Sequence, residues 1–219
     1  MSNRLTKSEV THLSSVAIIG WLAVTLQLYL IVLNRNTSVM ETIVRFFGFF
    51  TILSNILVAL CCTLMVMPAS KLRNFFSRAT TLTAICVYIT IVGIVYNVIL
   101  RFTWNPQGLQ FVVDETLHTF IPLAFVAYWL IFVPKDGLHW RDIPYWLMYP
   151  AAYLFYTLIR GSLTGYYPYP FLDIGELGYD RVAVNTSVLI LTFALFSMLF
   201  VSVGQRLSKR PLAPKRSDK

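Results

Sequence analysis

Six long apolar segments limit what this chain can fold into more than any other feature. Each is long enough to cross about 30 Å of hydrocarbon as an α-helix. The segments span residues 13–33, 43–67, 79–100, 114–133, 143–160 and 182–204. The fifth is the weakest because it is short and contains Pro144 and Pro150. The pattern predicts an all-α polytopic membrane protein, a bundle of six transmembrane helices.

Composition agrees with that fold class. Hydrophobic residues make up 57% of the 219 residues and charged residues only 13%, about half the share in soluble domains. This excludes a disordered chain, a collagen-like repeat, a disulfide scaffold and a nucleic-acid-binding module. Cys61, Cys62 and Cys86 fall within predicted spans and lack the spacing of metal ligands. The sequence contains no P-loop, GxSxG or HExxH motif, and it indicates no metal and no cofactor.

The basic residues, which leave a net charge of +8, give a predicted orientation. Six spans place both termini on one side, and that side collects 13 of the 18 Lys and Arg residues. The other five are Arg35, Arg45, Arg101, Arg160 and Arg181. The positive-inside rule predicts a cytoplasmic N-terminal tail (1–12), a six-helix domain (13–204) and a basic cytoplasmic tail (205–219). We interpret the basic tail as a topology anchor near anionic headgroups, not a nucleic-acid site. The expected location is the plasma membrane.

Polar residues within the predicted spans carry most of the functional information, because such groups are costly in hydrocarbon. In the predicted orientation most of them fall in the outer half of the bundle. This layer comprises Arg45, Thr51, Ser54, Asn55, Tyr96, Asn97, Arg101, Asp114, Glu115, His118, Thr119, Tyr156, Arg160, Asn185, Thr186 and Ser187. It predicts a polar site that opens toward the outer leaflet or the outer face.

His118 is the one histidine predicted within a span. A buried imidazole is suited to act as a general base or proton shuttle, but it can equally be a packing residue hydrogen-bonded across helices. Asp114 lies one helical turn earlier on the same face and is a candidate to orient the ring. The competing interpretation is that Asp114 simply favours the N-terminal end of its helix.

Thr51, Asn55 and Arg160 are further candidates, each with a structural alternative. A membrane-helix threonine commonly bonds back to a carbonyl of its own helix, whereas a nucleophilic one needs a nearby base and an oxyanion donor. Asn55, one turn from Thr51, could be that donor or could join two helices. Arg160 could bind a substrate carboxylate or extend to the interface.

Three local stretches of the sequence resemble the androgen-induced protein superfamily, which includes the androgen-dependent TFPI-regulating protein. They are Phe50-Thr51 followed by Ser54-Asn55, Leu117-His118-Thr119 followed by Pro122, and the segment from Gly165 to Asp173. The resemblance is greatest to small microbial members with six transmembrane segments, and it covers roughly residues 15–204 in topology.

The resemblance implies an intramembrane threonine hydrolase that cleaves fatty acid esters of hydroxy fatty acids. It places the nucleophile on Thr51 and the histidine on His118. Our hypothesis for the mechanism has a lipid ester entering laterally from the bilayer, with Asp114 orienting His118 and Asn55 or a neighbouring amide stabilising the oxyanion. No metal or organic cofactor takes part, and the expected partners are membrane lipids, not nucleic acid.

Two other classes of protein remain open from the sequence. Six spans with dispersed polar groups and Arg160 are compatible with a small-solute transporter. No repeat relates the two halves, and the inner half lacks a polar route. A membrane protein that binds lipid without catalysis is the third class.

Overall fold

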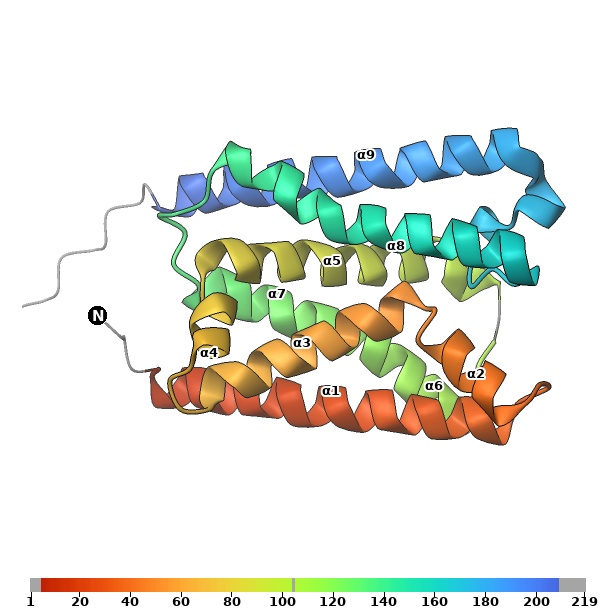
Figure 1. Ribbon diagram of the computed structural model, residues 1–219. Coiled ribbons are helices and arrows are strands. Elements are labelled where there is room, and N and C mark those ends of the chain that lie inside the picture. The colour runs from red at the N-terminus through yellow and green to blue at the C-terminus, as the bar shows by residue number, and fades with distance from the viewer. Residues whose placement is uncertain (1–4, 104, 209–219) are drawn as a thin grey trace, which may run out of the picture.

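The computed structural model describes residues 5–103 and 105–208, and within them all regular secondary structure is helical. The first half contains α1 (Lys7–Leu33), α2 (Val39–Phe46), α3 (Phe50–Val66), α4 (Lys71–Phe76), α5 (Ala79–Val98) and η1 (Leu100–Phe102). The second half contains α6 (Gly108–Glu115), η2 (Thr116–Phe120), α7 (Ile121–Phe132), η3 (Trp140–Asp142), α8 (Ile143–Thr164), η4 (Pro170–Leu172) and α9 (Ile174–Ser208). The long helices lie roughly along one axis, and the described chain begins and ends at the same end of the bundle (Figure 1).

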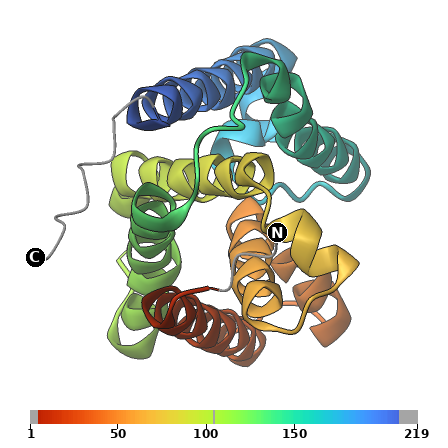
Figure 2. The same cartoon turned by 90° about the vertical axis from the view of Figure 1, so that its left-hand side faces the viewer.

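The bundle has two parts when seen from its end. Helices α1, α3, α5 and α7 surround one core, and the pair α8–α9 covers the α5 side (Figure 2). The core is close-packed around large side chains such as Trp129, Phe125 and Ile89, which are almost fully buried. This packing fixes the positions of α3, α5 and η2, the elements that carry the polar residues of interest.

Four helical stretches are long and apolar enough to cross a membrane: Lys7–Leu33, Ala79–Phe102, Gly108–Phe132 and Ile174–Ser208. The pair α2 and α3 makes a fifth if it is counted as one bent span. The all-α fold class is therefore confirmed, and several helices could cross a membrane. Helix α8 coincides with the predicted fifth segment but is not among these stretches.

The predicted continuous helix over 43–67 is wrong. The chain breaks between Phe46 and Phe50, and the two helices meet at an angle of 69°. Gly48 lies in the break, where its low helix propensity favours a change of direction. The freed carbonyl of Gly48 accepts a hydrogen bond from Tyr153 Oη at 2.9 Å, so the break costs no unsatisfied group at this position.

Other helix ends differ from the predicted boundaries for local reasons. Helix α1 begins at Lys7, inside the predicted tail 1–12, because Thr6 and Glu9 form a reciprocal capping box. The predicted span 114–133 begins earlier, at Gly108. Of the predicted basic tail, residues 205–208 continue α9, and residues 209–219 lie outside the described part of the chain.

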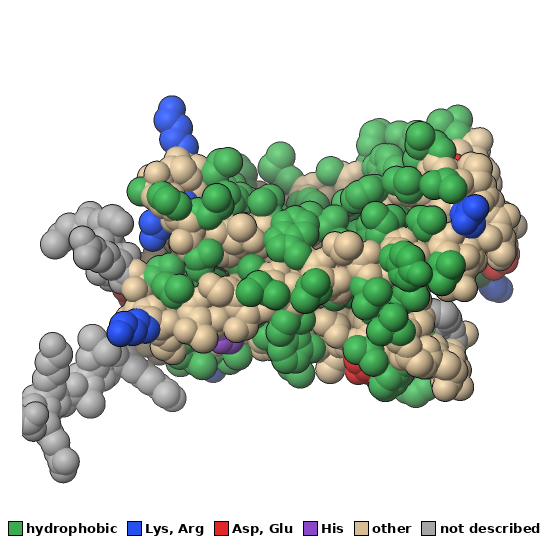
Figure 3. Space-filling view, turned by 90° about the horizontal axis from the view of Figure 1, so that it is seen from below, with side chains coloured by type: hydrophobic (Ala, Val, Ile, Leu, Met, Phe, Trp, Pro, Cys, Tyr) green, Lys and Arg blue, Asp and Glu red, His purple; other side chains and the backbone are tan. Residues whose placement is uncertain are grey.

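The outer surface of the bundle is strongly apolar. Large hydrophobic side chains are exposed on every long helix, among them Leu22, Phe155, Leu191 and Leu195. Figure 3 shows hydrophobic side chains along one face, with Lys and Arg side chains toward its two ends. A soluble domain rarely exposes so much contiguous apolar surface, which agrees with burial of this surface in lipid.

Candidate functional site

A cavity of about 340 Å³ lies beside the first turn of α3. Helices α1, α3, α5 and α6, the η2 segment and the loop before α9 all contribute to its wall. Its polar lining residues include Gln27, Thr51, Tyr96, Asp114, His118 and Tyr169. The structure thus brings Thr51, Asp114 and His118, three of the sequence-derived candidates, to one cavity.

His118 lies in a π-helical segment, and Pro122 explains why the backbone departs from an α-helix there. Proline has no N–H and its ring crowds the carbonyl of the residue four positions earlier, which is His118. Residues Thr116–Phe120 widen into a π-turn, in which the Ile121 N–H donates to the Thr116 carbonyl. The carbonyl of His118 instead accepts a hydrogen bond from Asn97 Nδ2 at 3.2 Å.

Hydrogen bonding fixes the tautomer of the neutral His118 ring. Nδ1 lies 2.9 Å from the backbone carbonyl oxygen of Asp114. A carbonyl can only accept, so Nδ1 carries the hydrogen and Nε2 keeps its lone pair. The imidazole therefore has the protonation pattern of a general base, with Nε2 as the basic atom.

Asp114 holds His118 through its main chain more closely than through its carboxylate. Its Oδ1 lies 3.8 Å from Nδ1, beyond hydrogen-bonding distance. Its Oδ2 accepts a hydrogen bond from Tyr96 Oη at 2.7 Å. The predicted orienting role of Asp114 thus falls largely to its carbonyl group, while the carboxylate anchors the tyrosine that stacks on the imidazole.

Thr51 is buried in the first turn of α3, where backbone N–H groups have no intrahelical acceptor. Its N–H donates to Tyr169 Oη at 3.3 Å, and its hydroxyl oxygen lies 3.4 Å from the same atom. The Thr51 hydroxyl makes no hydrogen bond back to a carbonyl of its own helix. This is because α3 begins at Phe50, so the residues three and four positions before Thr51 do not belong to that helix.

Thr51 and His118 share the cavity but are not hydrogen-bonded to each other. The hydroxyl of Thr51 contacts Tyr169, whereas the ring of His118 contacts Asp114 and Tyr96. The Thr51 hydroxyl must turn away from Tyr169, or a water molecule must lie between, for the two groups to exchange a proton.

Asn55 is fully buried and joins two elements of the bundle. Its Nδ2 donates to the carbonyls of Thr51 at 2.9 Å and Leu117 at 3.1 Å. Both amide hydrogens are therefore occupied, and Asn55 does not line the cavity. Its position fits the interpretation as a link between helices, not that of an oxyanion donor.

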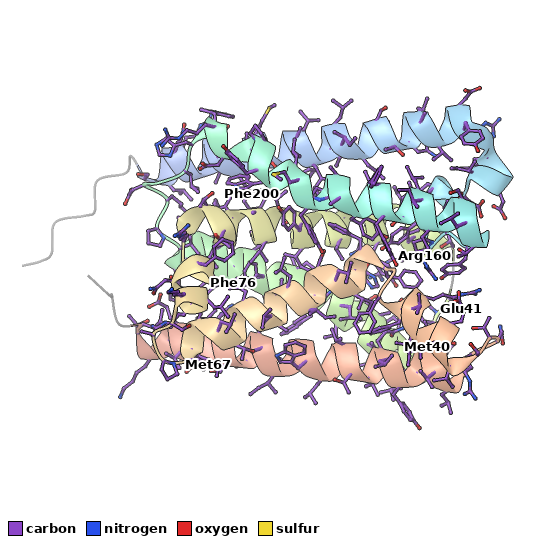
Figure 4. All side chains as sticks on the ribbon, in the orientation of Figure 1. Met40, Glu41, Met67, Phe76, Arg160 and Phe200 are labelled. Atoms are coloured by element: carbon purple, nitrogen blue, oxygen red, sulfur yellow. The ribbon has the colours of Figure 1, made fainter. Side chains whose placement is uncertain are left out.

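Arg160 lies apart from the cavity and contacts α2 instead. Figure 4 shows Arg160 and Glu41 toward the same end of the bundle, and the Arg160 guanidinium is 3.4 Å from the Glu41 carboxylate. Glu41 also pairs with Arg45 at 2.7 Å. Both arginines lie over the ring of Tyr166, with 4.1 Å from the Arg45 guanidinium carbon to the ring centroid. Burial raises the pKa of the Tyr166 phenol, and the two arginines oppose that rise. This cluster fastens α2 to the end of α8.

A second polar network lies between α5 and η2. Arg101 pairs with Glu115 and donates to Asn97 Oδ1 at 3.0 Å. Asn97 and Arg101 also contact the hydroxyl of Thr119 at 3.4 Å. The network fixes the π-segment against α5, so it holds His118 in place without contacting its ring.

Tyr169 is the site residue that sequence reasoning missed. It follows the left-handed turn at Gly165, whose φ of 68° favours glycine, and precedes η4. Asn185 Nδ2 donates to the Phe171 carbonyl at 2.9 Å and ties this loop to α9. Burial raises the pKa of Tyr169, which therefore stays a neutral phenol at the start of α3. Tyr169 lies between two prolines in the segment from Gly165 to Asp173 that carries the family resemblance, but these signals indicate a rigid segment and assign no role to the tyrosine.

Across residues 5–103 and 105–208, no group of three or more His, Cys, Asp or Glu side chains could hold a metal ion. The fold and the cavity define an all-helical protein with apolar helices able to cross a membrane and a polar cavity among them. Comparison with protein families, with characterised proteins and with solved structures finds no match to this chain.

Proposed function

We propose that the protein is an integral protein of the plasma membrane with six spans and both termini in the cytoplasm. The spans would be α1, the bent pair α2–α3, α5 with η1, α6 to α7, α8 and α9. The distribution of Lys and Arg supports this orientation, because 13 of 18 fall on the side of the termini under this topology.

Helix α8, the fifth span in chain order, is the one that raises the number of spans to six, and its length and surface support this assignment. Its 22 residues reach about 33 Å, enough for the hydrocarbon layer. It exposes Met148, Phe155, Ile159 and Leu163, which lipid would cover. It also packs along α9, which is itself long and apolar enough to span.

We further propose that the cavity hydrolyses a lipid ester, as the resemblance to the androgen-induced superfamily implies. The observation that carries this proposal is that Thr51 and His118, from separate helices, line one cavity. The tautomer of His118 adds support, because Nδ1 holds the hydrogen and the basic Nε2 makes no hydrogen bond to residues 5–103 or 105–208. The N-cap residue of α3, Phe49, makes no side-chain cap bond, and the Thr51 N–H, which donates to Tyr169 Oη, adds an amide donor next to the Thr51 hydroxyl.

In the proposed reaction, Nε2 of His118 takes the proton of the Thr51 hydroxyl as its oxygen attacks the ester carbonyl. The oxyanion binds the Thr51 N–H in place of Tyr169 Oη, so a main-chain amide, and not Asn55, serves as the oxyanion donor. Collapse breaks the ester C–O bond, and His118 returns the proton to the leaving alcohol. A water molecule, deprotonated by His118, then attacks the acyl carbonyl, the bond to Thr51 Oγ1 breaks to release a carboxylic acid, and His118 returns the proton to the Thr51 oxygen.

Purified full-length protein in nanodiscs, assayed with long-chain lipid esters, tests this function. We expect Thr51→Ala to lose at least about 10³-fold in kcat, because it removes the nucleophile. His118→Asn keeps a donor for the Asp114 carbonyl but removes the base, so it should fold normally and lose activity to a similar extent. Thr51→Ser should retain measurable hydrolysis and react with a fluorophosphonate probe.

Thr90→Ala is the matched control. Thr90 lies on α5 outside the cavity and bonds back to the Cys86 carbonyl. We expect this variant to hydrolyse esters and to bind the probe like the parent protein. Hydrolysis by folded Thr51→Ala at the parent rate would overturn the proposed function.

A further inference from the structure

Thr51 lies between two cavities, of which one has several polar side chains in its wall and the other is almost entirely apolar. One is the polar cavity that contains His118, and the other is an apolar slot between α5, α8 and α9. Thr51 and Tyr169 line both. The apolar slot is lined chiefly by Val92, Val95, Leu154, Phe171, Leu189 and Phe193.

The slot offers few partners for a polar group. The polar side chains in its wall are those of Thr51, Tyr153 and Tyr169. Tyr153 donates to the Gly48 carbonyl at 2.9 Å, and Tyr169 is occupied by Thr51. Apolar cavities of this kind stay dry and accept hydrocarbon. The two sides of Thr51 thus match the two sides of an ester, a hydrocarbon chain and a more polar remainder.

We propose that the apolar slot binds the acyl chain of the ester that Thr51 attacks, while the leaving alcohol lies in the polar cavity. This inference rests on the proposed function, because it takes the ester carbonyl to lie at Thr51. Each cavity thereby recognises one part of the substrate. Access from lipid fits the slot, since its helices α8 and α9 expose apolar side chains outward.

The size of the slot gives the inference a quantitative form. Its free volume of about 50 Å³ is several times the roughly 10–15 Å³ that a single water-sized sphere needs. This is room for the first few methylene groups of a chain. Each methylene buried there should raise kcat/KM about fourfold. Methylenes beyond those few should add little.

A series of p-nitrophenyl esters with acyl chains from acetyl to palmitoyl measures this dependence. We expect kcat/KM to rise steeply over the first carbons and then to level off. Leu189→Trp fills the slot, so it should abolish the steep rise and bring kcat/KM for long-chain esters down toward the value for short-chain esters. Leu189→Ala should extend the rise to longer chains.

Leu191→Trp is the matched control, because Leu191 is two residues away on α9 and is 60% exposed on the outer surface. It should leave the chain-length dependence unchanged. A chain-length profile that is the same in the parent, Leu189→Trp and Leu189→Ala would overturn the inference.

A binding measurement separates this inference from the proposed function. A diazirine-bearing palmitic acid, photolysed with the full-length Thr51→Ala variant, should label residues on α5, α8 and α9 that line the slot. Excess unlabelled palmitic acid should suppress that labelling. If the slot is labelled but the parent protein hydrolyses no ester, the proposed hydrolase function is wrong and acyl-chain binding in the slot stands. If the parent hydrolyses esters but labelling is confined to the outer surface, acyl-chain binding in the slot is wrong.

Discussion

The phenol ring of Tyr96 lies flat against the imidazole ring of His118, with 3.8 Å between ring centroids and 11° between planes. The same tyrosine donates to the carboxylate of Asp114, whose carbonyl accepts from His118. The three residues thus form a closed set of contacts that fixes the plane and the tautomer of the imidazole. Such double restraint is what a base needs to keep one nitrogen directed to a substrate.

Substitutions of Tyr96 should separate the two restraints. Tyr96→Phe keeps the stacking and loses the hydrogen bond to Asp114, whereas Tyr96→Leu loses both. We expect kcat for ester hydrolysis to fall in the order parent, Phe, Leu, with smaller changes in KM. Stability should fall by about 1.5–3 kcal/mol for the lost bond to a charged group. Tyr88→Phe removes a comparable buried hydroxyl, which donates to the Trp146 carbonyl, and should leave kcat unchanged. A Tyr96→Leu variant with the parent kcat would contradict the role of the stacking.

Asn55→Ala should affect folding and not the reaction. The substitution leaves the Thr51 and Leu117 carbonyls without their shared donor, at a cost of about 1–3 kcal/mol. Thermal unfolding in detergent measures that loss. Hydrolysis per folded molecule should stay within about threefold of the parent, whereas loss of an oxyanion donor would lower it about 10²-fold or more. A loss of about 10²-fold in a well-folded Asn55→Ala variant would instead indicate that Asn55 is an oxyanion donor.

Gly93→Ala should displace the π-segment. A β-carbon there would lie 3.1 Å from the His118 carbonyl oxygen and 3.2 Å from Pro122 Cβ. Such overpacking costs about 1–3 kcal/mol, and moving η2 should lower kcat as well. Gly137→Ala is the control, since nothing lies within 4 Å of its β-carbon. That variant should match the parent in both unfolding temperature and kcat, and equal behaviour of the two variants would contradict the close contact.

Lys135 should stabilise the end of α7. It is buried, and Nζ donates to the carbonyls of Trp129 at 2.6 Å and Val133 at 2.5 Å. Lys135→Met leaves these carbonyls unsatisfied, so we expect a loss of about 1–3 kcal/mol in thermal or denaturant unfolding. Lys71→Met, at an exposed lysine, should change stability by less than about 0.5 kcal/mol.

Lys135 should also make the stability of the parent protein depend on pH in a way that Lys135→Met does not. Burial lowers the pKa of Lys135 below its ordinary value of 10.5. Between the folded and the unfolded pKa the unfolded chain binds more protons, so this residue makes stability rise with pH in that window. Unfolding curves recorded across the window for parent and Lys135→Met should show the rise only in the parent. The same slope in both proteins would contradict it.

The helices were predictable because their apolar runs are long, and the all-α fold class followed from them. The break at Gly48 was not predictable from the sequence. It depends on Tyr153, more than a hundred residues later, which donates a hydrogen bond to the freed Gly48 carbonyl. Glycine alone does not break an apolar helix of this length.

The candidate residues were predictable as a layer but not as contacts. Thr51 and His118 share a cavity because α3 and η2 pack side by side, and no local pattern encodes that packing. Pro122 is a local signal from which an irregular helix near His118 could have been predicted, whereas the stacking of Tyr96 and the approach of Tyr169 depend on tertiary structure. The guanidinium of Arg160 is a group that could bind a substrate carboxylate, yet the position of α2 gives it Glu41 as its partner.

The bend between α2 and α3 has an electrostatic consequence for everything bound beside Thr51. It starts a new helix inside a stretch apolar enough to cross a bilayer, so the macrodipole of α3 places roughly half a positive charge there. A lysine at the same depth would be costly and could lose its proton. A field made of peptide groups does not titrate, and it remains constant as the pH on either side of the membrane changes.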